Sequence, residues 1–400
     1  MTVPRYRLQP FLKTVFPFSV VPILLLVSIF YLNFICRIVL SPLLPVIEQD
    51  LGLGHGKAGS LFLFMALGYG MGLLGSGFVA SRLNYRQTIL LSAEILGAAM
   101  IAISQSASLF GMSSGLIIAG LSAGFYLPSA IAIITDLVNR EHWGKAIAFH
   151  EIAPNLGFIT APLLAEVLLR FISWRGILGL FGCGSILMGF VFSRLGRGGD
   201  HKGEEPRIKA IKDMMVRPLF WNLSALCVVT IGASFAVYSM MPLFLVTEVG
   251  MDRGMANTLV GLSRLMATGF LFLSGWILDR YGHKQATRFF VTATGLSTLL
   301  LGWVRAPLLT PILILLQAVF AASLFPCMFT LMPLLFPPSL RGLGLSLVVI
   351  IGFFIGGGAI PWGIGILAEN LSFSAGFSLL GILSLSLLPL VIRIESSRTA

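Results

Sequence analysis

Two arginines lie inside long apolar segments, where a charged side chain is costly. Arg37 lies in the segment Val20–Leu44 and Arg264 in the segment Ala256–Leu278, each seven or eight residues from one end. If these segments are membrane-spanning helices, both arginines lie about 10–12 Å below one membrane surface. An arginine at that depth usually faces a cavity, a partner or a transport pathway. Its planar fork suits the oxygens of carboxylate, sulfonate or phosphate groups.

Polar side chains accompany these arginines at helical spacing. Asn33, Arg37 and Ser41 recur at every fourth residue, and Ser234 and Tyr238 form a similar stripe on another apolar segment. Neither arginine has an acidic residue at equal depth in its own helix. We therefore expect a negatively charged substrate to neutralise the two guanidinium groups. The structural alternatives are an ion pair with a buried carboxylate from elsewhere, or snorkelling to the membrane surface.

A second polar group could move protons. His150 and Glu151 are adjacent in the apolar segment Ile147–Leu169, and Asn155 follows Glu151 by one helical turn. Acids and histidines inside membranes often relay protons. His150 and Glu151 are therefore predicted to couple transport to protons, and Asn155 is predicted to lie on the substrate-binding face. The alternative is that Glu151 pairs with Lys145 or with the loop of a cytoplasmic gate.

Three more residues in the apolar segments have polar side chains of interest. Tyr126 and Tyr69 could line a cavity or simply pack, and packing is the expectation for Tyr69. Glu166 precedes Arg170 by four residues, which is the favourable spacing for an ion pair on one helix. We therefore interpret Glu166 as structural.

Two G-x-S-x-G matches raise the possibility of a serine hydrolase. They are Gly111–Gly115, which falls between two apolar segments, and Gly120–Gly124, which lies within one. Neither lies at a strand-to-helix elbow, and His150 is expected near the other end of the membrane. The run 150–154 is not H-E-x-x-H, the cysteines lack metal-ligand spacing, and there is no P-loop. No enzymatic activity and no metal or nucleotide cofactor are expected.

The composition shows what kind of elements must hold these residues. Charged residues make up 11% of the chain, against about 25% in a soluble domain. Long stretches, such as Ile95–Thr135 and Ala306–Leu340, contain no charged residue at all. A membrane β-barrel would instead show alternating segments of about ten residues. The sequence predicts an all-α membrane protein.

Cutting the chain where charges and polar clusters interrupt the apolar runs gives twelve spans. They are Val20–Leu44, Ala58–Ala80, Thr88–Ser106, Ser113–Leu137, Ile147–Leu169, Gly176–Phe192, Trp221–Val246, Ala256–Leu278, Arg288–Val304, Pro311–Leu335, Gly344–Leu367 and Phe373–Ile392. A polar stretch, 194–217, separates six spans from six and is expected to be a cytoplasmic linker.

The basic residues predict the orientation of the spans. Twenty lysines and arginines fall on the side of the termini and five on the other side. Lys and Arg excess marks the cytoplasmic side, so both termini are expected there. This bias explains the net charge of +11 without a nucleic-acid partner. We expect a monomer in the plasma membrane, with a bacterial inner membrane favoured and the lipid bilayer as its surroundings.

The two sets of six spans contain an internal repeat. A shift of 198 residues places 77–86 on 275–284, Pro128 on Pro326 and Gly144 on Gly342. The sequence therefore predicts two duplicated bundles, 1–193 and 218–400. Parallel duplication of this kind is a transporter architecture with its site between the halves.

The loop after the second span of the C-terminal copy carries a specific motif. Gly275-x-x-x-Asp279-Arg280-x-Gly282-His283-Lys284 resembles the signature of the major facilitator superfamily, and the resemblance covers the whole chain. It implies two six-helix halves with a central cavity lined by spans one and seven. The arginines and polar stripes described above would face that cavity.

The same resemblance implies a gate on the cytoplasmic side. Asp279 would face the N-terminus of span five near Gly144, where the helix dipole favours negative charge. Ser81 stands where the family usually has Asp, and is expected to bond more weakly to span eleven. The other residues assigned to this gate are Arg82, Arg86, Asp136, Arg280, Gly282 and Lys284. The alternative is that these loops only fix tight turns.

These features together predict a secondary transporter of a small organic anion that works by alternating access. The pair Cys36-Arg37 stands where organic-anion symporters of the superfamily often carry Asp-Arg. The main alternative is an exporter of lipophilic compounds, which the many Met and Phe residues would suit. Against it, Gly120 occupies a place where drug antiporters often have Arg. A channel or receptor is disfavoured by the duplicated halves.

Overall fold

The apolar segments form helices long enough to cross a membrane. The computed structural model describes residues 20–203, 208–304, 306, 308–335 and 341–391. Within them, eleven helices have the length and hydropathy of a membrane span. The longest, α14 (Arg253–Trp303), bends at one residue and contains two of the expected spans. The described chain therefore contains twelve spans, as the sequence predicts.

The N-terminal half contains spans one to six. Its elements are α2 (Val20–Ile38), α3 (Leu40–Leu51), α4 (His55–Arg82), α5 (Tyr85–Ser104), α6 (Leu109–Gly124), α7 (Tyr126–Leu137), η1 (Arg140–His142), α8 (Trp143–His150), α9 (Ile152–Leu168) and α10 (Trp174–Leu195). A short helix, α11 (Ile208–Met215), lies in the expected linker.

The C-terminal half contains spans seven to twelve. Its elements are α12 (Pro218–Ile231), η2 (Gly232–Ala236), α13 (Val237–Thr247), α14, α15 (Leu309–Leu335), α16 (Arg341–Ile351), η4 (Gly352–Ala359), α17 (Ile360–Asn370) and α18 (Phe373–Ser386). Because the number of spans is even, Val20 and Val391 lie on the same side of the molecule. We call that side the terminal face and the other the opposite face.

Prolines explain where spans of the N-terminal half are interrupted. A proline lacks an N–H group, and its ring clashes with the carbonyl four residues earlier. Three helices end at that residue: α2 at Ile38, α6 at Gly124 and α8 at His150, ahead of Pro42, Pro128 and Pro154. The bend in α14 has another cause, since Gly282 has φ +78° and ψ 158°. Only glycine adopts such a conformation readily.

Two spans of the C-terminal half contain π-helical turns. Span seven includes η2 and span eleven includes η4. The two segments pack against each other, and a methyl group at Gly356 would lie 2.8 Å from the backbone nitrogen of Gly232. Wide turns of this kind occur often at functional sites.

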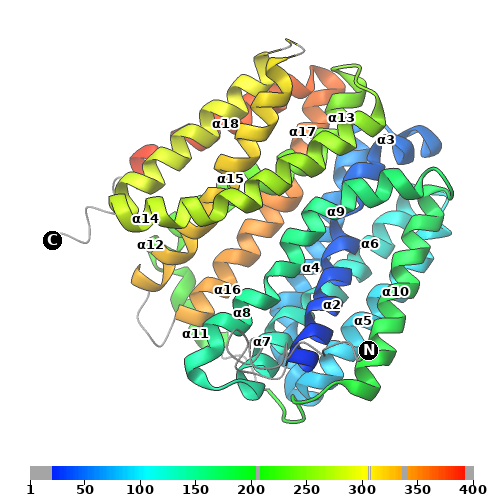
Figure 1. Cartoon of the computed structure of the whole chain (residues 1–400), viewed down its shortest axis with the longest axis vertical. Coiled ribbons are helices and arrows are strands. Elements are labelled where there is room, and N and C mark those ends of the chain that lie inside the picture. The colour runs from blue at the N-terminus through cyan, green and yellow to red at the C-terminus, as the bar shows by residue number, and fades with distance from the viewer. Residues whose placement is uncertain (1–19, 204–207, 305, 307, 336–340, 392–400) are drawn as a thin grey trace, which may run out of the picture.

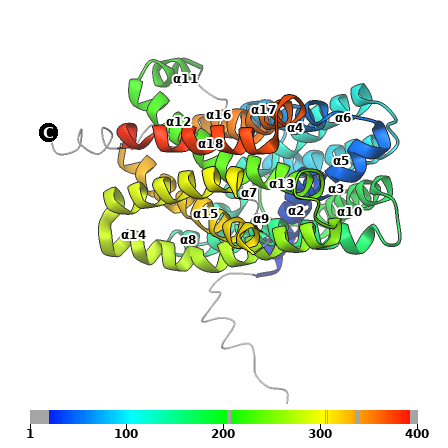
Figure 2. The same cartoon turned by 90° about the horizontal axis from the view of Figure 1, so that it is seen from above.

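The halves share part of their hydrophobic core. One hydrophobic cluster, which includes Leu43, Phe62 and Phe244, joins residues of both halves. Two others belong to single halves, one around Ile133 and one around Phe290. In Figure 2, α14 and α15 lie on one side and α5, α6 and α10 on the other. The helices α3 and α13 meet between them in both views (Figures 1 and 2).

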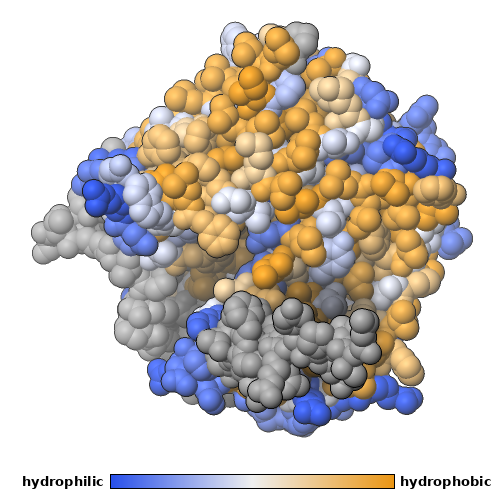
Figure 3. Space-filling view, viewed as in Figure 1, coloured by the Kyte–Doolittle hydropathy of each residue, from blue (hydrophilic) through white to orange (hydrophobic). Residues whose placement is uncertain are grey.

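The outer surface suits a lipid environment. Large apolar side chains such as Leu187, Phe272 and Trp276 are exposed around the bundle. Figure 3 shows a broad apolar face with hydrophilic residues gathered toward its edges. An exposed apolar surface of this extent would be unstable in water. The protein is therefore an integral membrane protein.

Candidate substrate site and gates

Arg37 is a buried cation near the middle of the first span. Its exposed fraction is 8%. The guanidinium carbon lies 4.2 Å from the ring centre of Tyr69 and 5.0 Å from that of Phe34. Among the described residues it forms no hydrogen bond or ion pair, and its Nε atom has no acceptor. Among the described residues, these two ring faces are the contacts that stabilise the charge.

Arg264 is also buried, but its guanidinium group is anchored. Nη1 donates to Ser234 Oγ at 3.0 Å and Nη2 donates to the Ser234 carbonyl oxygen at 2.7 Å. The rings of Phe158 and Tyr238 each lie 4.9 Å from the guanidinium carbon. A cavity of about 10 Å³ adjoins it, with room for about one water molecule. No carboxylate contacts Arg264 in the part of the chain that the structure describes.

Aromatic rings connect the two arginines. The Phe34 ring, which contacts Arg37, lies 5.0 Å from the Phe158 ring, which contacts Arg264. The Tyr238 hydroxyl is buried and has no hydrogen-bond partner among the described residues. The structure thus brings Arg37, Arg264, Ser234 and Tyr238 into one region between the halves. In this conformation, packed rings rather than open space separate the two guanidinium groups.

The other expected substrate residues use their polar groups elsewhere. Asn33 Nδ2 donates to the Ala123 carbonyl oxygen of α6 at 3.2 Å. Asn155 Nδ2 donates to the carbonyl oxygen of Glu151 in its own span at 3.0 Å. The Tyr126 hydroxyl bonds the Leu26 carbonyl oxygen. These three side chains serve the N-terminal half internally.

His150 and Glu151 lie together but differ in burial. His150 is fully buried, stacks on the Phe30 ring at 4.5 Å and contacts the Tyr126 hydroxyl through Nε2 at 3.0 Å. Its Nδ1 lies 3.4 Å from Oε1 of Glu151, whose side chain is 47% exposed. Glu151 therefore lies beside His150 rather than in an ion pair with Lys145.

Most residues assigned to the inner gate contact no residue of the other half. Ser81 Oγ donates to the Phe78 carbonyl oxygen of its own helix. No heavy atom lies within 4 Å of the methyl position at Gly144, the expected partner of Asp279. Four of the gate residues are exposed and form no hydrogen bond or ion pair with any described residue. They are Arg82, Asp279, Arg280 and Lys284. These gate residues therefore make no contact between the halves among the described residues, and the gate assignment stays a prediction.

Two gate residues contact the start of the linker instead. Arg86 Nη2 donates to the Ser193 carbonyl oxygen at 2.9 Å, and Nη1 lies 3.9 Å from Asp200. Asp136 lies 3.1 Å from His201. The residues after α10 therefore pack on the terminal face of the N-terminal half.

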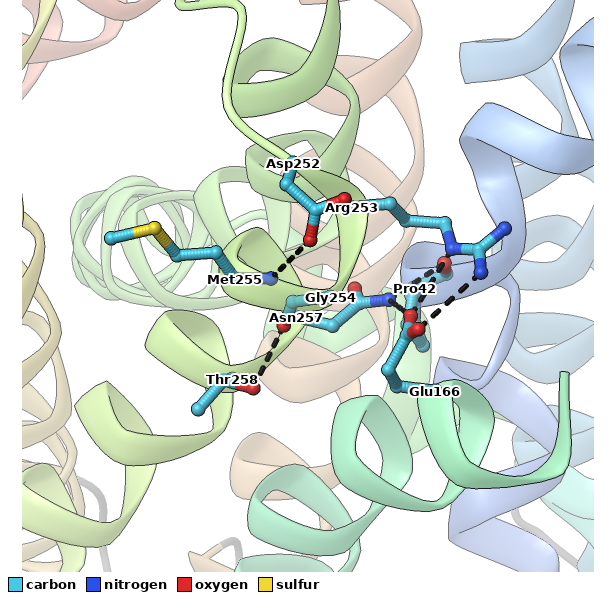
Figure 4. Close-up of polar contacts among 8 residues, drawn as sticks. All are labelled: Pro42, Glu166, Asp252, Arg253, Gly254, Met255, Asn257 and Thr258. Carbon is cyan, nitrogen blue, oxygen red and sulfur yellow. Dashed lines mark hydrogen bonds and ion pairs between the residues drawn. The ribbon is translucent and has the colours of Figure 1, made fainter. Parts of the chain in front are cut away.

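Glu166 forms an ion pair across the two halves, so the expected pair with Arg170 is wrong. Arg253 donates to Glu166 from Nε at 3.1 Å and from Nη2 at 3.3 Å, and Asn257 Nδ2 donates at 3.3 Å (Figure 4). Helix α9 ends at Leu168, so Arg170 lies beyond the helix and the spacing rule does not apply. Sequence reasoning missed this contact between spans five and eight.

A second carboxylate makes the equivalent contact between spans eleven and two. Glu369, at the end of α17, accepts a hydrogen bond from the Gly56 backbone nitrogen at 2.9 Å. Gly56 is at the start of α4, as Arg253 is at the start of α14. Each half therefore places a carboxylate at the beginning of a helix of the other half, where the dipole favours negative charge. We call these two contacts the outer lock.

Comparison with known proteins identifies this arrangement. A model of the Major Facilitator Superfamily matches residues 25–315. The chain belongs to the major facilitator superfamily. Its described helices show the architecture of that family, with six spans in each half.

Solved structures support the same fold. A bacterial homologue of the human lysosomal transporter Spinster, in an inward-facing and occupied conformation, superposes with a TM-score of 0.82. It is 15% identical, and the match covers 95% of this chain and 97% of that one. A D-xylose–proton symporter gives a TM-score of 0.72 at 17% identity over 91% and 96% of the two chains.

Curated relatives match a smaller share of this chain, and their names give different substrates. Multidrug resistance protein MdtL of Klebsiella pneumoniae subsp. pneumoniae is 22% identical over 60% of this chain, and a probable nitrate transporter, NarT, of Staphylococcus epidermidis is 23% identical over 64%. The chain spans 62% and 65% of the lengths of these two relatives.

Proposed function

We propose that this transporter moves a small organic anion by alternating access. The observation that carries the proposal is Arg37, a buried guanidinium group that no described carboxylate or hydrogen-bond acceptor neutralises. Removing such a charge from water costs several kcal/mol even after relaxation. Contact with a ring face returns about 2 kcal/mol when the site is dry. An anion that binds beside Arg37 would offset the remainder.

Arg264 supplies the second positive charge from the other half. Ser234 fixes two of its nitrogens, so the guanidinium fork is held in one orientation. The Tyr238 hydroxyl, which lacks a partner among the described residues, would complete the site. We restrict the proposed site to these three residues and Arg37.

Alternating access requires the outer lock to break. Both lock contacts join the halves at the opposite face, whereas the gate residues on the terminal face form no contact between the halves among the described residues. In the other state we propose that Asp279 binds the N-terminus of α8 and closes the terminal face, with Ser81 acting more weakly on span eleven. Residues 1–193 and 218–400 would move as two bodies joined by 194–217.

Charged residues also support proposals for the orientation of the protein and for proton coupling. The excess of lysine and arginine on the terminal face supports a cytoplasmic position for both termini. We propose a monomer in the plasma membrane. His150 and Glu151 would carry the coupling proton, since the buried imidazole lies 3.4 Å from a partly exposed carboxylate.

Export of lipophilic compounds is the second candidate. The aromatic rings between the halves and the similarity to a multidrug resistance protein favour it. A cationic drug would not neutralise Arg37, whereas a neutral one could still bind among the rings.

Ligand-induced stabilisation of the purified protein separates these functions. A bound ligand raises stability by RT ln(1 + [L]/Kd). We expect carboxylates to raise the unfolding temperature of the wild-type protein, and to have no effect on Arg37→Lys, which keeps the charge but loses the fork. Stabilisation by tetraphenylphosphonium, a lipophilic cation, without any anion effect would overturn the proposal.

A further inference from the structure

A layer of aromatic side chains surrounds Arg37 and Arg264. Each half contributes three rings. They are Phe34, Tyr69 and Phe158 from the N-terminal half, and Phe235, Tyr238 and Phe353 from the C-terminal half. We call these six the aromatic layer. Both guanidinium groups lie on ring faces of this layer.

The rings form one continuous series of edge-to-face contacts. Phe34 lies 5.0 Å from Phe158, Phe158 lies 4.9 Å from Phe235, and Phe235 lies 5.0 Å from Phe353. Phe353 in turn lies 5.3 Å from Tyr69. All four pairs have ring planes inclined by 70–79°. This is the geometry that the quadrupoles of aromatic rings favour.

Three rings of the layer are only half-buried. Phe158, Phe235 and Phe353 have intermediate exposure, whereas Phe34, Tyr69 and Tyr238 are buried. Phe235 and Phe353 lie on the two π-helical segments, and each touches a ring of the N-terminal half. Movement of one half against the other would therefore separate these rings from their partners.

The layer restricts what can reach the arginines. A hydrated inorganic anion would have to lose its water molecules among apolar rings. This loss is unfavourable because the rings offer no hydrogen bonds to replace those of water. A flat aromatic ring attached to a carboxylate would instead form edge-to-face contacts with the rings of the layer, in place of those that it displaces. Its carboxylate could then meet Arg37, whose Nε atom has no acceptor among the described residues.

We propose that the substrate is an aromatic monocarboxylate whose ring intercalates in the aromatic layer while its carboxylate binds Arg37. This inference rests on the proposed function, because it presupposes an anion at Arg37. The buried Tyr238 hydroxyl, without a described partner, offers one hydrogen bond to a polar substituent on the substrate ring.

Equilibrium binding to the purified full-length protein tests the inference. The probes are benzoate, cyclohexanecarboxylate, acetate, nitrate and tetraphenylphosphonium. Benzoate and cyclohexanecarboxylate have the same charge and similar size, but only benzoate is flat and carries a ring quadrupole. We expect benzoate to bind about tenfold more tightly than cyclohexanecarboxylate, from two or more aromatic contacts.

A matched pair of variants links the preference to the layer. Phe235→Leu removes a ring that contacts Phe34, Phe158 and Phe353, and should reduce the preference for benzoate over cyclohexanecarboxylate to about twofold. Phe272→Leu removes a ring that is 86% exposed on the surface and should leave the preference unchanged.

The outcomes separate this inference from the proposed function. Equal binding of benzoate and cyclohexanecarboxylate would overturn the aromatic inference and leave the organic-anion transporter standing. Binding of nitrate alone would overturn both. Binding of tetraphenylphosphonium with none of the anions would overturn both. An unchanged benzoate preference in Phe235→Leu would mean that the benzoate ring does not bind in the aromatic layer, which would also overturn the inference.

Discussion

Replacing Glu166 with glutamine should open the opposite face. Glu166 belongs to the N-terminal half and accepts hydrogen bonds from Arg253 and Asn257 of the C-terminal half. Glutamine has nearly the same shape but no charge. Glu166→Gln should therefore weaken the state that is closed at the opposite face and leave the fold of each half intact.

The size of the effect follows from the geometry of the ion pair. Hydrogen bonds to a charged group contribute about 1.5–3 kcal/mol and neutral ones about 0.5–1.5 kcal/mol. Glu166 is 14% exposed but Arg253 is 36% exposed, so water screens part of the difference. We expect a loss of about 1–2 kcal/mol, which changes the ratio of the two states by about 5–30-fold.

Distances between spin labels would report this change. Gln49 and Thr247, one from each half, line the same pocket on the opposite face and are suitable labelling sites. The exposed Cys183 would first be replaced by serine. In Glu166→Gln, the ratio of the long-distance to the short-distance population should increase by the stated factor.

A carboxylate that bonds within one half provides the control. Asp50 also lies near the opposite face, but it pairs with Arg175 and accepts a hydrogen bond from Trp174, all in the N-terminal half. Asp50→Asn should therefore leave the distance distribution unchanged. If Glu166→Gln behaves like Asp50→Asn, the Glu166–Arg253 pair is not part of a lock and the reasoning is refuted.

Four further predictions follow from the same contacts. Glu369→Gln should shift the distribution of label distances in the same direction as Glu166→Gln. The loss should be only about 0.3–1 kcal/mol, because Glu369 is an exposed residue that accepts one backbone hydrogen bond at a helix terminus; a shift the other way would contradict the outer lock. Arg37→Met should abolish anion binding yet raise the unfolding temperature, because it removes a buried charge without a described acceptor; a lowered temperature would mean that Arg37 is a structural residue. His150→Gln should remove the pH dependence of substrate uptake while binding persists, and an unchanged pH profile would exclude His150 from coupling. Asp279→Asn should favour the state open at the terminal face, measured by accessibility labelling, and unchanged labelling would show that the gate assignment is wrong.

Spans and their interruptions could be predicted from local rules. About 20 apolar residues are needed to cross a membrane, and this length, together with the charges and polar clusters that interrupt the apolar runs, located the twelve spans. The break after His150 follows from the ring of Pro154, and the bend in α14 follows from Gly282. The burial of Arg37 and Arg264 could also be expected from their depth in apolar segments.

Contacts between the halves could not be predicted from the same rules. Glu166 and Arg253 are 87 residues apart in sequence. Arg170, four residues after Glu166, was predicted as the partner instead because it is nearer and at helical spacing. The aromatic layer draws its rings from five different spans, so no periodic pattern reveals it. Tyr69 was expected only to pack, yet its ring is the nearest one to the Arg37 guanidinium group. These contacts depend on how the helices pack against one another, which the local sequence pattern of a single helix does not show.

Counterflow of labelled benzoate in proteoliposomes tests the central claim most directly, because it needs neither the coupling ion nor the direction of transport. Vesicles loaded with unlabelled benzoate should accumulate the label transiently when they contain the wild-type protein. Arg37→Lys should abolish this accumulation, since the lysine ammonium cannot form two parallel hydrogen bonds to a carboxylate. Counterflow of benzoate by Arg37→Lys at the wild-type level would contradict the account. Counterflow of a lipophilic cation but not of benzoate by the wild-type protein would contradict it as well.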